Sequence, residues 1–211
     1  FGLTVLIAII VGAKRNLHNR TVQEEVNKNV ELKKSIKTYQ EEYYKLCSNN
    51  ILHLFEEFYT TGGERISIYK HQGDHFTLLG RCSKNSAYNK YTNYKYHDNE
   101  GLIGKGWDEN EVIITGSPKW TGKGKDYKDF MKSKCNISDK RLRKIRMKSR
   151  SLFVRTINDN ITASNPDGII VFESMNPEKI SSAECNRLIA ENEKALLTLL
   201  KNMKNLTKKI E

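Results

Sequence analysis

The stretch from Asn99 to Trp107 reads NEGLIGKGW and carries three glycines within six residues. Glycine-rich runs that open a helix can hold phosphate groups on their backbone amides. The dinucleotide-binding fingerprint requires the spacing G-x-G-x-x-G after a strand, whereas this run has G-x-x-G-x-G. The phosphate loop of nucleotide hydrolases requires Lys and then Ser or Thr after its last glycine, but Trp107 and Asp108 stand there. The sequence therefore predicts a tight structural turn instead of a nucleotide site.

The cysteines and histidines form no pattern for metal binding or nucleophilic catalysis. The chain has five histidines and four widely spaced cysteines, Cys47, Cys82, Cys135 and Cys185. Because no C-x-x-C pair is present, we expect neither a structural zinc site nor a disulfide framework. No motif places a nucleophile beside a base and an orienting group. We therefore expect reduced cysteines, no metal, no cofactor, no catalytic residues and no enzyme activity.

One segment, residues 119–150, holds almost all of the net positive charge. It contains thirteen Lys or Arg against three Asp, a net +10 of the chain's +11. Such a local field attracts anions. The anion-contacting candidates are Lys140, Arg141, Arg143, Lys144, Arg146 and Lys148. The partner stays open between anionic lipid headgroups, an acidic protein, a small anion, and nucleic acid stacked on Trp120, Tyr127 or Phe130. A solvated surface with no partner is the remaining interpretation.

The chain opens with an apolar run. Residues 1–13 carry no charge, and Lys14 and Arg15 follow at once. A membrane-spanning helix needs about 20 apolar residues, but the chain begins with Phe instead of Met. We therefore predict a transmembrane segment over 1–13 that is truncated at its N-terminus, with a signal peptide or a buried helix as the alternative. Positive charge after an apolar run places the following chain in the cytoplasm, which predicts a single-pass protein of the cell membrane.

Two segments, 14–60 and 181–211, have the periodicity of long helices. In 14–60, apolar residues follow the 4-3-4-3 spacing of a coiled coil, at Leu32, Ile36, Tyr39, Tyr43 and Leu46. The second segment opens with the capping box SSAE, from Ser181 to Glu184. Its own 4-3 seam runs through Cys185, Ile189, Asn192, Leu196, Leu199, Met203, Leu206 and Ile210. We expect these helices to pair with each other or with a second copy of the chain, which predicts a homo-oligomer.

Between the long helices, in residues 61–180, short runs alternate as they do in β-strands. RISIYKH and DHFTLLGRCS flank a short QGD turn, which predicts a hairpin. EVIITG, SRSLFVRTI and DGIIVFES predict three more strands, and the last is apolar on both faces, as in a central strand. Hairpins in one sheet with the helices gathered on one face predict an α+β domain.

The order of these motifs resembles that of GAF domains. The pieces that carry the resemblance are RISIYKHQGDHFTLLGRCSKN, NEGLIGKGWDENEVIITG and SRSLFVRTI with DGIIVFES. The resemblance implies a GAF-like antiparallel sheet with the N- and C-terminal long helices packed on one face, and it makes 119–150 a basic insert. It also implies a ligand pocket between the sheet and the loop-helix layer, at Arg81, Ser83, Tyr94, Tyr96, Trp107 and Trp120. The alternative is that these aromatic side chains fill the core.

The resemblance implies a regulatory protein. The leading hypothesis is a membrane-tethered cytoplasmic GAF-type sensor or adaptor that senses a ligand or partner and relays the change through its long helices. Because no kinase, cyclase or nuclease motif is present, we expect a separate effector protein, as in a stress or phage-defence system. The first alternative is an anion-contacting module that binds nucleic acid or a larger complex through 119–150. The second is an enzyme similar to the GAF-type reductases of free methionine sulfoxide, with Cys82 and Cys135 as its cysteines.

Overall fold

The computed structural model describes residues 2–158, 166 and 168–207, and the chain divides into two compact units, 1–43 and 44–211. The helix α1 (Gly2–Leu54) forms the described part of the first unit and continues into the second. It contains no proline, the residue that most strongly interrupts a helix. In the first unit, Leu32 and Tyr39 of the predicted seam are 51% and 65% exposed. Most of each of these side chains therefore faces solvent.

None of the helices in the described part of the chain has a stretch both long enough and apolar enough to cross a membrane. The predicted single-pass membrane localisation is therefore wrong.

The second unit is built on one six-stranded sheet in which every neighbouring pair is antiparallel. The order is β3-β2-β1-β6-β5-β4. Its strands are β1 (Glu64–Gln72), β2 (His75–Cys82), β3 (Tyr96–His97), β4 (Glu111–Ile114), β5 (Ser151–Ile157) and β6 (Gly168–Ser174). The predicted hairpin is confirmed, because Gln72 pairs with His75 across the turn. β6 lies between β1 and β5 and is buried along its whole length, as predicted for a central strand.

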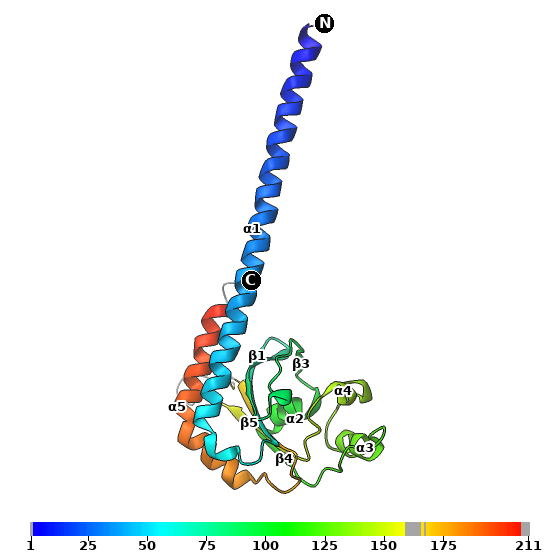
Figure 1. The fold of residues 1–211 in the computed structure, drawn as a ribbon, viewed down its shortest axis with the longest axis vertical. Helices are drawn as coiled ribbons and strands as arrows, with labels where there is room; N and C mark the ends of the chain where they lie inside the picture. The colour runs from blue at the N-terminus through cyan, green and yellow to red at the C-terminus, as the bar shows by residue number, and fades with distance from the viewer. Residues whose placement is uncertain (1, 159–165, 167, 208–211) are drawn as a thin grey trace. The chain divides into compact units, whose positions relative to one another are not determined.

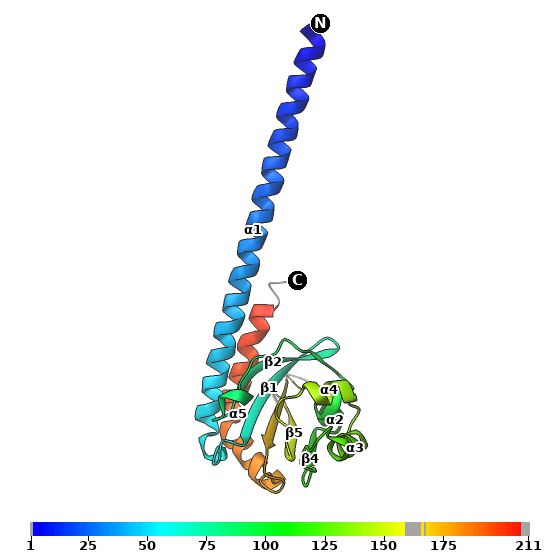
Figure 2. The same ribbon diagram turned by 45° about the vertical axis from the view of Figure 1, so that its right-hand side comes forward.

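Helices cover both faces of the sheet (Figure 2). On one face, the end of α1 and the helix α5 (Ser182–Thr207) share a core that includes Ile51, Phe55, Phe172 and Leu188. The rings of Phe55 and Phe172 meet edge to face, with 5.4 Å between their centroids. The prediction of an α+β domain with both long helices on one face is confirmed.

Three shorter helices cover the opposite face (Figure 1). They are α2 (Gly101–Glu109), α3 (Lys125–Lys134) and α4 (Asp139–Lys144). Tyr127, Met131 and Leu142 from α3 and α4 are buried in a second core together with Val154 of β5. The basic segment 119–150 is thus an integral layer of the domain, because its apolar side chains complete this core.

The glycine run forms a turn and the start of α2, as the sequence predicts. Gly101 has a φ of +67°, which L residues with a side chain rarely adopt. Its amide donates to the carbonyl of Asn136 at 2.7 Å, so that amide is engaged with protein. Gly106 allows α2 to approach the sheet closely, because an added Cβ would lie 2.5 Å from Val154 Cγ1. Gly104 packs against the backbone of the preceding turn, because an added Cβ would lie 2.3 Å from the carbonyl oxygen of Asp98.

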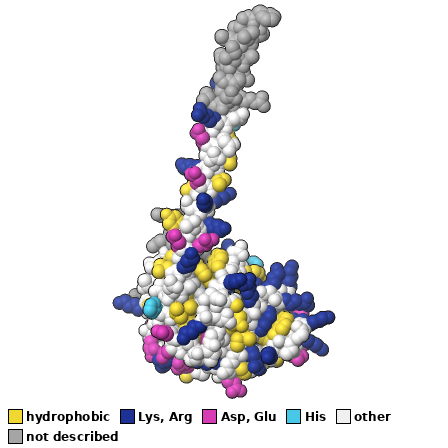
Figure 3. Space-filling view, in the orientation of Figure 1, with side chains coloured by type: hydrophobic (Ala, Val, Ile, Leu, Met, Phe, Trp, Pro, Cys, Tyr) yellow, Lys and Arg dark blue, Asp and Glu magenta, His cyan; other side chains and the backbone are white. Residues whose placement is uncertain are grey.

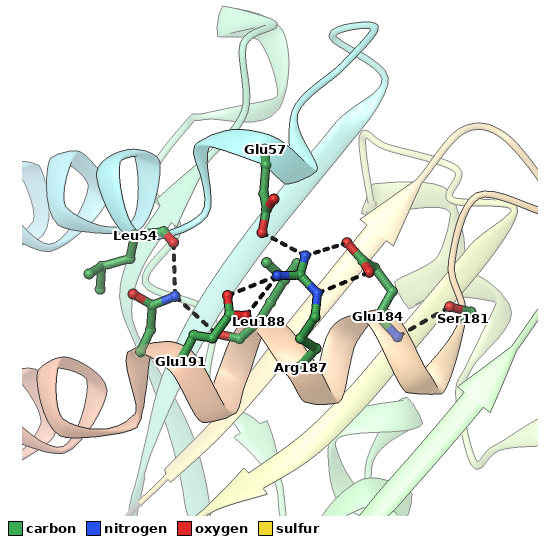
Figure 4. A network of polar contacts seen from close by, with 8 residues as sticks. Leu54, Glu57, Ser181, Glu184, Arg187, Leu188 and Glu191 are labelled. Atoms are coloured by element: carbon green, nitrogen blue, oxygen red, sulfur yellow. Dashed lines mark hydrogen bonds and ion pairs between the residues drawn. The ribbon is translucent and has the colours of Figure 1, made fainter.

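Polar contacts join α5 to the end of α1 and to the short 3₁₀ helix Glu56–Phe58 that follows it, beside the core that they share (Figure 4). Arg187 forms an ion pair with Glu57 at 2.7 Å and two more with glutamates of its own helix, at 2.9 and 2.8 Å. Asn192 donates its side-chain amide to the carbonyl of Leu54 at 3.0 Å. That carbonyl belongs to the last turn of α1, where the carbonyl oxygens have no amide partner within the helix. The two long helices are therefore coupled by polar as well as apolar contacts.

Of the two hydrogen bonds of the predicted capping box of α5, the one made by the serine side chain is present. Ser181 Oγ accepts a hydrogen bond from the amide of Glu184 at 3.3 Å. Cys185, Ile189 and Leu196 of the predicted seam are buried against the sheet. The remaining seam residues near the C-terminus lie outside the side chains that the structure describes, namely Met203, Leu206 and Ile210.

Candidate ligand-binding site

A buried ion pair lies on the face of the sheet that α4 covers. Arg65 of β1 and Glu173 of β6 are directly paired residues of neighbouring strands. Their bond is bidentate, with Nε to Oε2 at 2.6 Å and Nη2 to Oε1 at 2.7 Å. Ser149 Oγ donates to the same carboxylate at 2.9 Å. Burial acts to raise the pKa of Glu173, but Arg65 and then Arg81 outweigh it, so the pKa lies below its usual value.

Arg81 of β2 is a second buried guanidinium on this face of the sheet. It is 8% exposed, and it lies opposite Ser67 in the β1–β2 register. Its Nε donates to Ser67 Oγ at 2.9 Å and its Nη2 donates to Tyr69 Oη at 2.8 Å. Its third contact, from Nη1 to the carbonyl of Lys90, is long at 3.5 Å. All three acceptors are neutral, so within the described chain no carboxylate forms an ion pair with Arg81.

Arg141 of α4 lies over Tyr94, in the loop that follows β2, and over Tyr96, the first residue of β3. Its guanidinium carbon lies 3.5 Å from the ring centroid of Tyr94 and 4.6 Å from that of Tyr96. Its Nη2 donates to Tyr96 Oη. Its Nε is buried, and no described residue accepts a hydrogen bond from it. Burial raises the pKa of both tyrosines, so both hydroxyls are neutral at physiological pH.

These side chains line a cavity of about 330 Å³, within the range of about 300–1,000 Å³ that is usual for small-molecule sites. Four tyrosines contribute to the wall, namely Tyr88, Tyr91, Tyr94 and Tyr96. Six cations contribute as well, namely Arg65, Arg81, Lys90, Arg141, Lys144 and Arg146. Among the described residues that line the cavity there is no Asp or Glu. The cavity is therefore aromatic and strongly cationic.

The cavity unites residues that the sequence assigned to two different sites. Arg81, Tyr94 and Tyr96 come from the predicted ligand pocket, and Arg141, Lys144 and Arg146 come from the predicted anion-contacting set. The link between the two sets is Arg141, because its guanidinium stacks on both tyrosines. The two predictions therefore describe one site in this structure.

Three predicted pocket residues lie elsewhere. Ser83 lines a second hollow, of about 500 Å³, beside the end of α1, and Arg81 is the one described cavity residue that also lines this hollow. Trp107 stacks on His71 with 4.3 Å between ring centroids. Trp120 packs at 5.7 Å from the ring of Tyr127, which is buried. Both tryptophans thus contribute to packing, which was the alternative interpretation of these aromatic residues.

The remaining members of the anion-contacting set do not line the cavity. The Lys148 ammonium donates to the carbonyls of Leu142, Arg143 and Ile145 at the end of α4, and burial lowers its pKa. Lys148 thus closes a helix C-terminus. Arg143 is exposed and lies 4.0 Å from Asp139, and Lys140 is exposed. The basic side chains that reach solvent gather over α3 and α4 (Figure 3).

Arg65, Lys90, Tyr88 and Tyr91 line the cavity but were missed in the sequence. A signal for Arg65 was present, since Arg65, Ser67 and Tyr69 alternate with isoleucines in β1. A strand with polar residues on one face and both faces covered is a candidate for a buried polar site. The loop residues carried no such signal.

The cysteines of the reductase alternative are not brought together. Cys82 belongs to the core under α1 and α5, whereas Cys135 belongs to the core on the opposite face of the sheet. Burial raises the pKa of Cys82, and it raises the pKa of Cys135 to about 11. In the described part of the chain, no three His, Cys, Asp or Glu side chains cluster as metal ligands would.

No protein-family profile and no curated protein sequence matches this chain. Among solved structures, the GAF domain of a two-component sensor histidine kinase from Bacillus halodurans aligns with a TM-score of 0.50 at 11% identity, covering 74% of this chain and 92% of that one. The GAF domain region of a putative membrane protein from Geobacter sulfurreducens has a TM-score of 0.49 at 13% identity, covering 81% and 98%. A type II free methionine-R-sulfoxide reductase from Thermoplasma acidophilum has 0.48 at 12%, covering 77% and 95%.

Similarity to solved structures at sequence identities this low is evidence for the fold alone. The likeness to the Bacillus halodurans GAF domain agrees with the observed antiparallel sheet, with the terminal helices on one face and short helices on the other. The predicted resemblance is confirmed at this level: the chain has a GAF-like fold.

Proposed function

We propose that this protein is a GAF-type sensor that binds a small ligand in the cavity under α4 and relays the binding event to a separate effector protein. The observation that carries the proposal is the cavity itself, in which Arg81 and Arg141 are held in fixed positions with hydrogen-bond donors still unused. Cavities with a few convergent polar groups are the usual small-molecule sites of proteins.

The relay has a direct physical route through β2. The side chain of Arg81 lines the cavity, while its backbone amide donates to Ser48 Oγ of α1 at 3.1 Å. The preceding residue, Gly80, packs on the same helix so closely that an added Cβ would lie 2.7 Å from Cys47 Cβ. A ligand that moves Arg81 therefore acts on α1, and the contacts of Asn192 with Leu54 extend the coupling to α5.

The output of the sensor is the pairing of α1 between two copies of the chain. Leu32 and Tyr39 lie one heptad apart on α1 and are largely exposed, which is the pattern of an unpaired coiled-coil seam. We infer that α1 pairs with a second copy of the chain and that the effector reads the paired helices.

The test is a thermal-shift screen of the purified full chain against a library of neutral, cationic and anionic metabolites, followed by hydrogen exchange with each hit. We expect at least one compound to raise the melting temperature and to change amide exchange over residues 44–54 of α1 and over α5. If no compound stabilises the protein, or if hits leave both helices unchanged, the sensor proposal fails.

A second candidate function is nucleic-acid binding through the basic surface over α3 and α4 (Figure 3). The density of exposed Lys and Arg favours it, since phosphate contacts dominate such affinity. Of the aromatic residues expected to stack on bases, however, Tyr127 is buried and its hydroxyl donates to the Ser149 carbonyl at 3.2 Å. Fluorescence anisotropy with labelled single-stranded and duplex DNA and RNA tests this function, and binding that weakens steeply with salt would support it.

A further inference from the structure

We propose that the ligand of the cavity under α4 is a small polyanion, such as a phosphate ester or a compact di- or tricarboxylate. Arg81 from the sheet and Arg141 from α4 bind it. This inference rests on the proposed sensor function, because it names the ligand class of the same cavity. It goes beyond that function because it requires the ligand to be a polyanion.

The charge of the lining is the first support. Six cations line the cavity, no described lining residue is acidic, and Arg65 alone among the six has an ion pair with a buried carboxylate. Glu173 is the carboxylate of that pair, and Arg81 as well as Arg65 lowers its pKa, so one negative charge is shared between two buried guanidinium groups. A bound anion supplies the countercharge that the protein itself does not.

The unused donors of Arg81 are the second support. A guanidinium has five N–H donors, and the structure gives Arg81 contacts to Ser67, Tyr69 and Lys90, the last at the limit of hydrogen bonding. The two close contacts hold the plane of the group, because Ser67 and Tyr69 stand two residues apart on the strand β1. The remaining N–H groups are therefore fixed in direction, at a residue that is 8% exposed.

The geometry of Arg141 is the third support. Stacking on Tyr94 and Tyr96 fixes the plane of its guanidinium. Its Nε is buried, and no acceptor for it exists in the described chain. Buried donors without a partner are rare and are commonly explained by a missing ion or ligand. Arg141 also lines the cavity, so an acidic oxygen of the ligand would accept from its guanidinium donors other than the one bonded to Tyr96.

Two fixed guanidinium groups that line one cavity match a ligand with two acidic groups or one multiply charged group. A single carboxylate would satisfy only one of them. Exposed Lys144 and Arg146 at the rim add attraction that steers such an anion inward. The volume of about 330 Å³ limits the body of the ligand to a compact one.

Isothermal titration calorimetry of the full chain with two probes, inorganic pyrophosphate and citrate, tests the inference. Binding by one or both is expected, and which of them binds more tightly separates the phosphate from the carboxylate chemistry. Arg141→Gln removes a charged donor without altering the sheet, and we expect it to raise the Kd by about tenfold or more. Arg81→Lys keeps the positive charge but loses the planar set of N–H donors, and we expect the Kd to rise by a similar factor.

A matched pair of double variants separates the cavity from the general field. Lys144→Gln with Arg146→Gln removes two charges at the rim, while Lys140→Gln with Arg143→Gln removes two from exposed positions outside the cavity. We expect the rim pair to weaken binding several-fold more than the outer pair at the same ionic strength. Equal weakening by the two pairs, or no binding of either probe, would overturn the inference.

These results also distinguish the inference from the proposed function. If a neutral compound from the screen binds, Arg141→Gln leaves its Kd unchanged and neither probe binds, the polyanion inference fails while the sensor proposal stands. If a probe binds with the expected variant effects but leaves α1 and α5 unchanged in hydrogen exchange, the polyanion inference stands and the relay fails.

Discussion

At the scale of single residues, the Arg65–Glu173 pair carries the strongest expectation for stability. Both side chains are less than 10% exposed, at 7% and 9%. Glu173→Gln leaves a buried guanidinium without its countercharge, and we expect the free energy of unfolding to fall by about 3–5 kcal/mol. Urea denaturation at neutral pH measures it. Exposed Glu178→Gln is the control, with an expected change within about 0.5 kcal/mol. Similar losses in the two variants would mean that the pair is not structural.

The same pair determines a pH dependence whose sign follows from the pKa of Glu173. That pKa lies below its ordinary value of 4.5 in the folded protein. The contribution of Glu173 to stability is therefore fully present above about pH 4.5 and is lost as the pH falls through the folded pKa. We expect Glu173→Gln to have a flatter dependence of unfolding free energy on pH than the wild type between about pH 5 and pH 3. Parallel curves for the two proteins would contradict this.

Cys82 and Cys135 give a second expectation at this scale. A sulfoxide reductase requires a thiolate that attacks and a second thiol that resolves the intermediate. Here the two thiols lie in cores on opposite faces of the sheet, and burial raises the pKa of both. We expect slow alkylation of both cysteines by iodoacetamide at neutral pH in the folded protein, rapid alkylation in urea, and no reduction of free methionine sulfoxide. Turnover that is lost in Cys82→Ser and Cys135→Ser would restore the enzyme alternative.

At the scale of elements, the contact between β2 and α1 is where ligand binding meets the helices. Ser48→Ala removes the acceptor of the Arg81 amide and leaves every residue of the cavity lining in place. We expect its Kd for pyrophosphate to stay within about twofold of the wild type, since no ligand contact is lost. The change in hydrogen exchange over residues 44–54 on adding pyrophosphate should be lost.

The control for Ser48→Ala is Asn50→Ala on the same helix. Asn50 donates its side-chain amide to the carbonyl of Leu46 in its own helix, so it should keep the ligand-dependent change. A Ser48→Ala variant that still transmits the change would place the coupling elsewhere, in the packing of Gly80 on Cys47.

The elements themselves were largely predictable from the sequence, because each has a local period. The isoleucines of β1 alternate with polar residues, and the seam of α5 repeats every three to four positions, so strand, helix and buried face followed. The cavity was not predictable as one site. Arg141 and Tyr96 are 45 residues apart, and only the tertiary packing of α4 against β3 brings them together. Lys148 was misassigned for the same reason, since its acceptors are backbone carbonyls that the sequence does not reveal.

At the scale of the whole molecule, α1 predicts the assembly. Leu32 and Tyr39 leave apolar surface exposed on the helix at a spacing of seven residues. Two helices that join along this seam bury that surface in knobs-into-holes packing. We expect the purified full chain to dimerise, and sedimentation equilibrium over a range of protein concentrations measures its dissociation constant.

Leu32→Gln with Tyr39→Gln makes the seam polar while keeping good helix formers, so we expect dissociation to monomers at concentrations where the wild type is dimeric. Glu31→Gln with Thr38→Gln introduces the same residues one position earlier, off the seam, and should leave the dimer intact. If both variants stay dimeric, the seam does not join the copies, and an effector reading paired helices loses its physical basis. If the seam variant alone is monomeric and still binds pyrophosphate as the wild type does, sensing resides in residues 44–211 and its output in the pairing of α1.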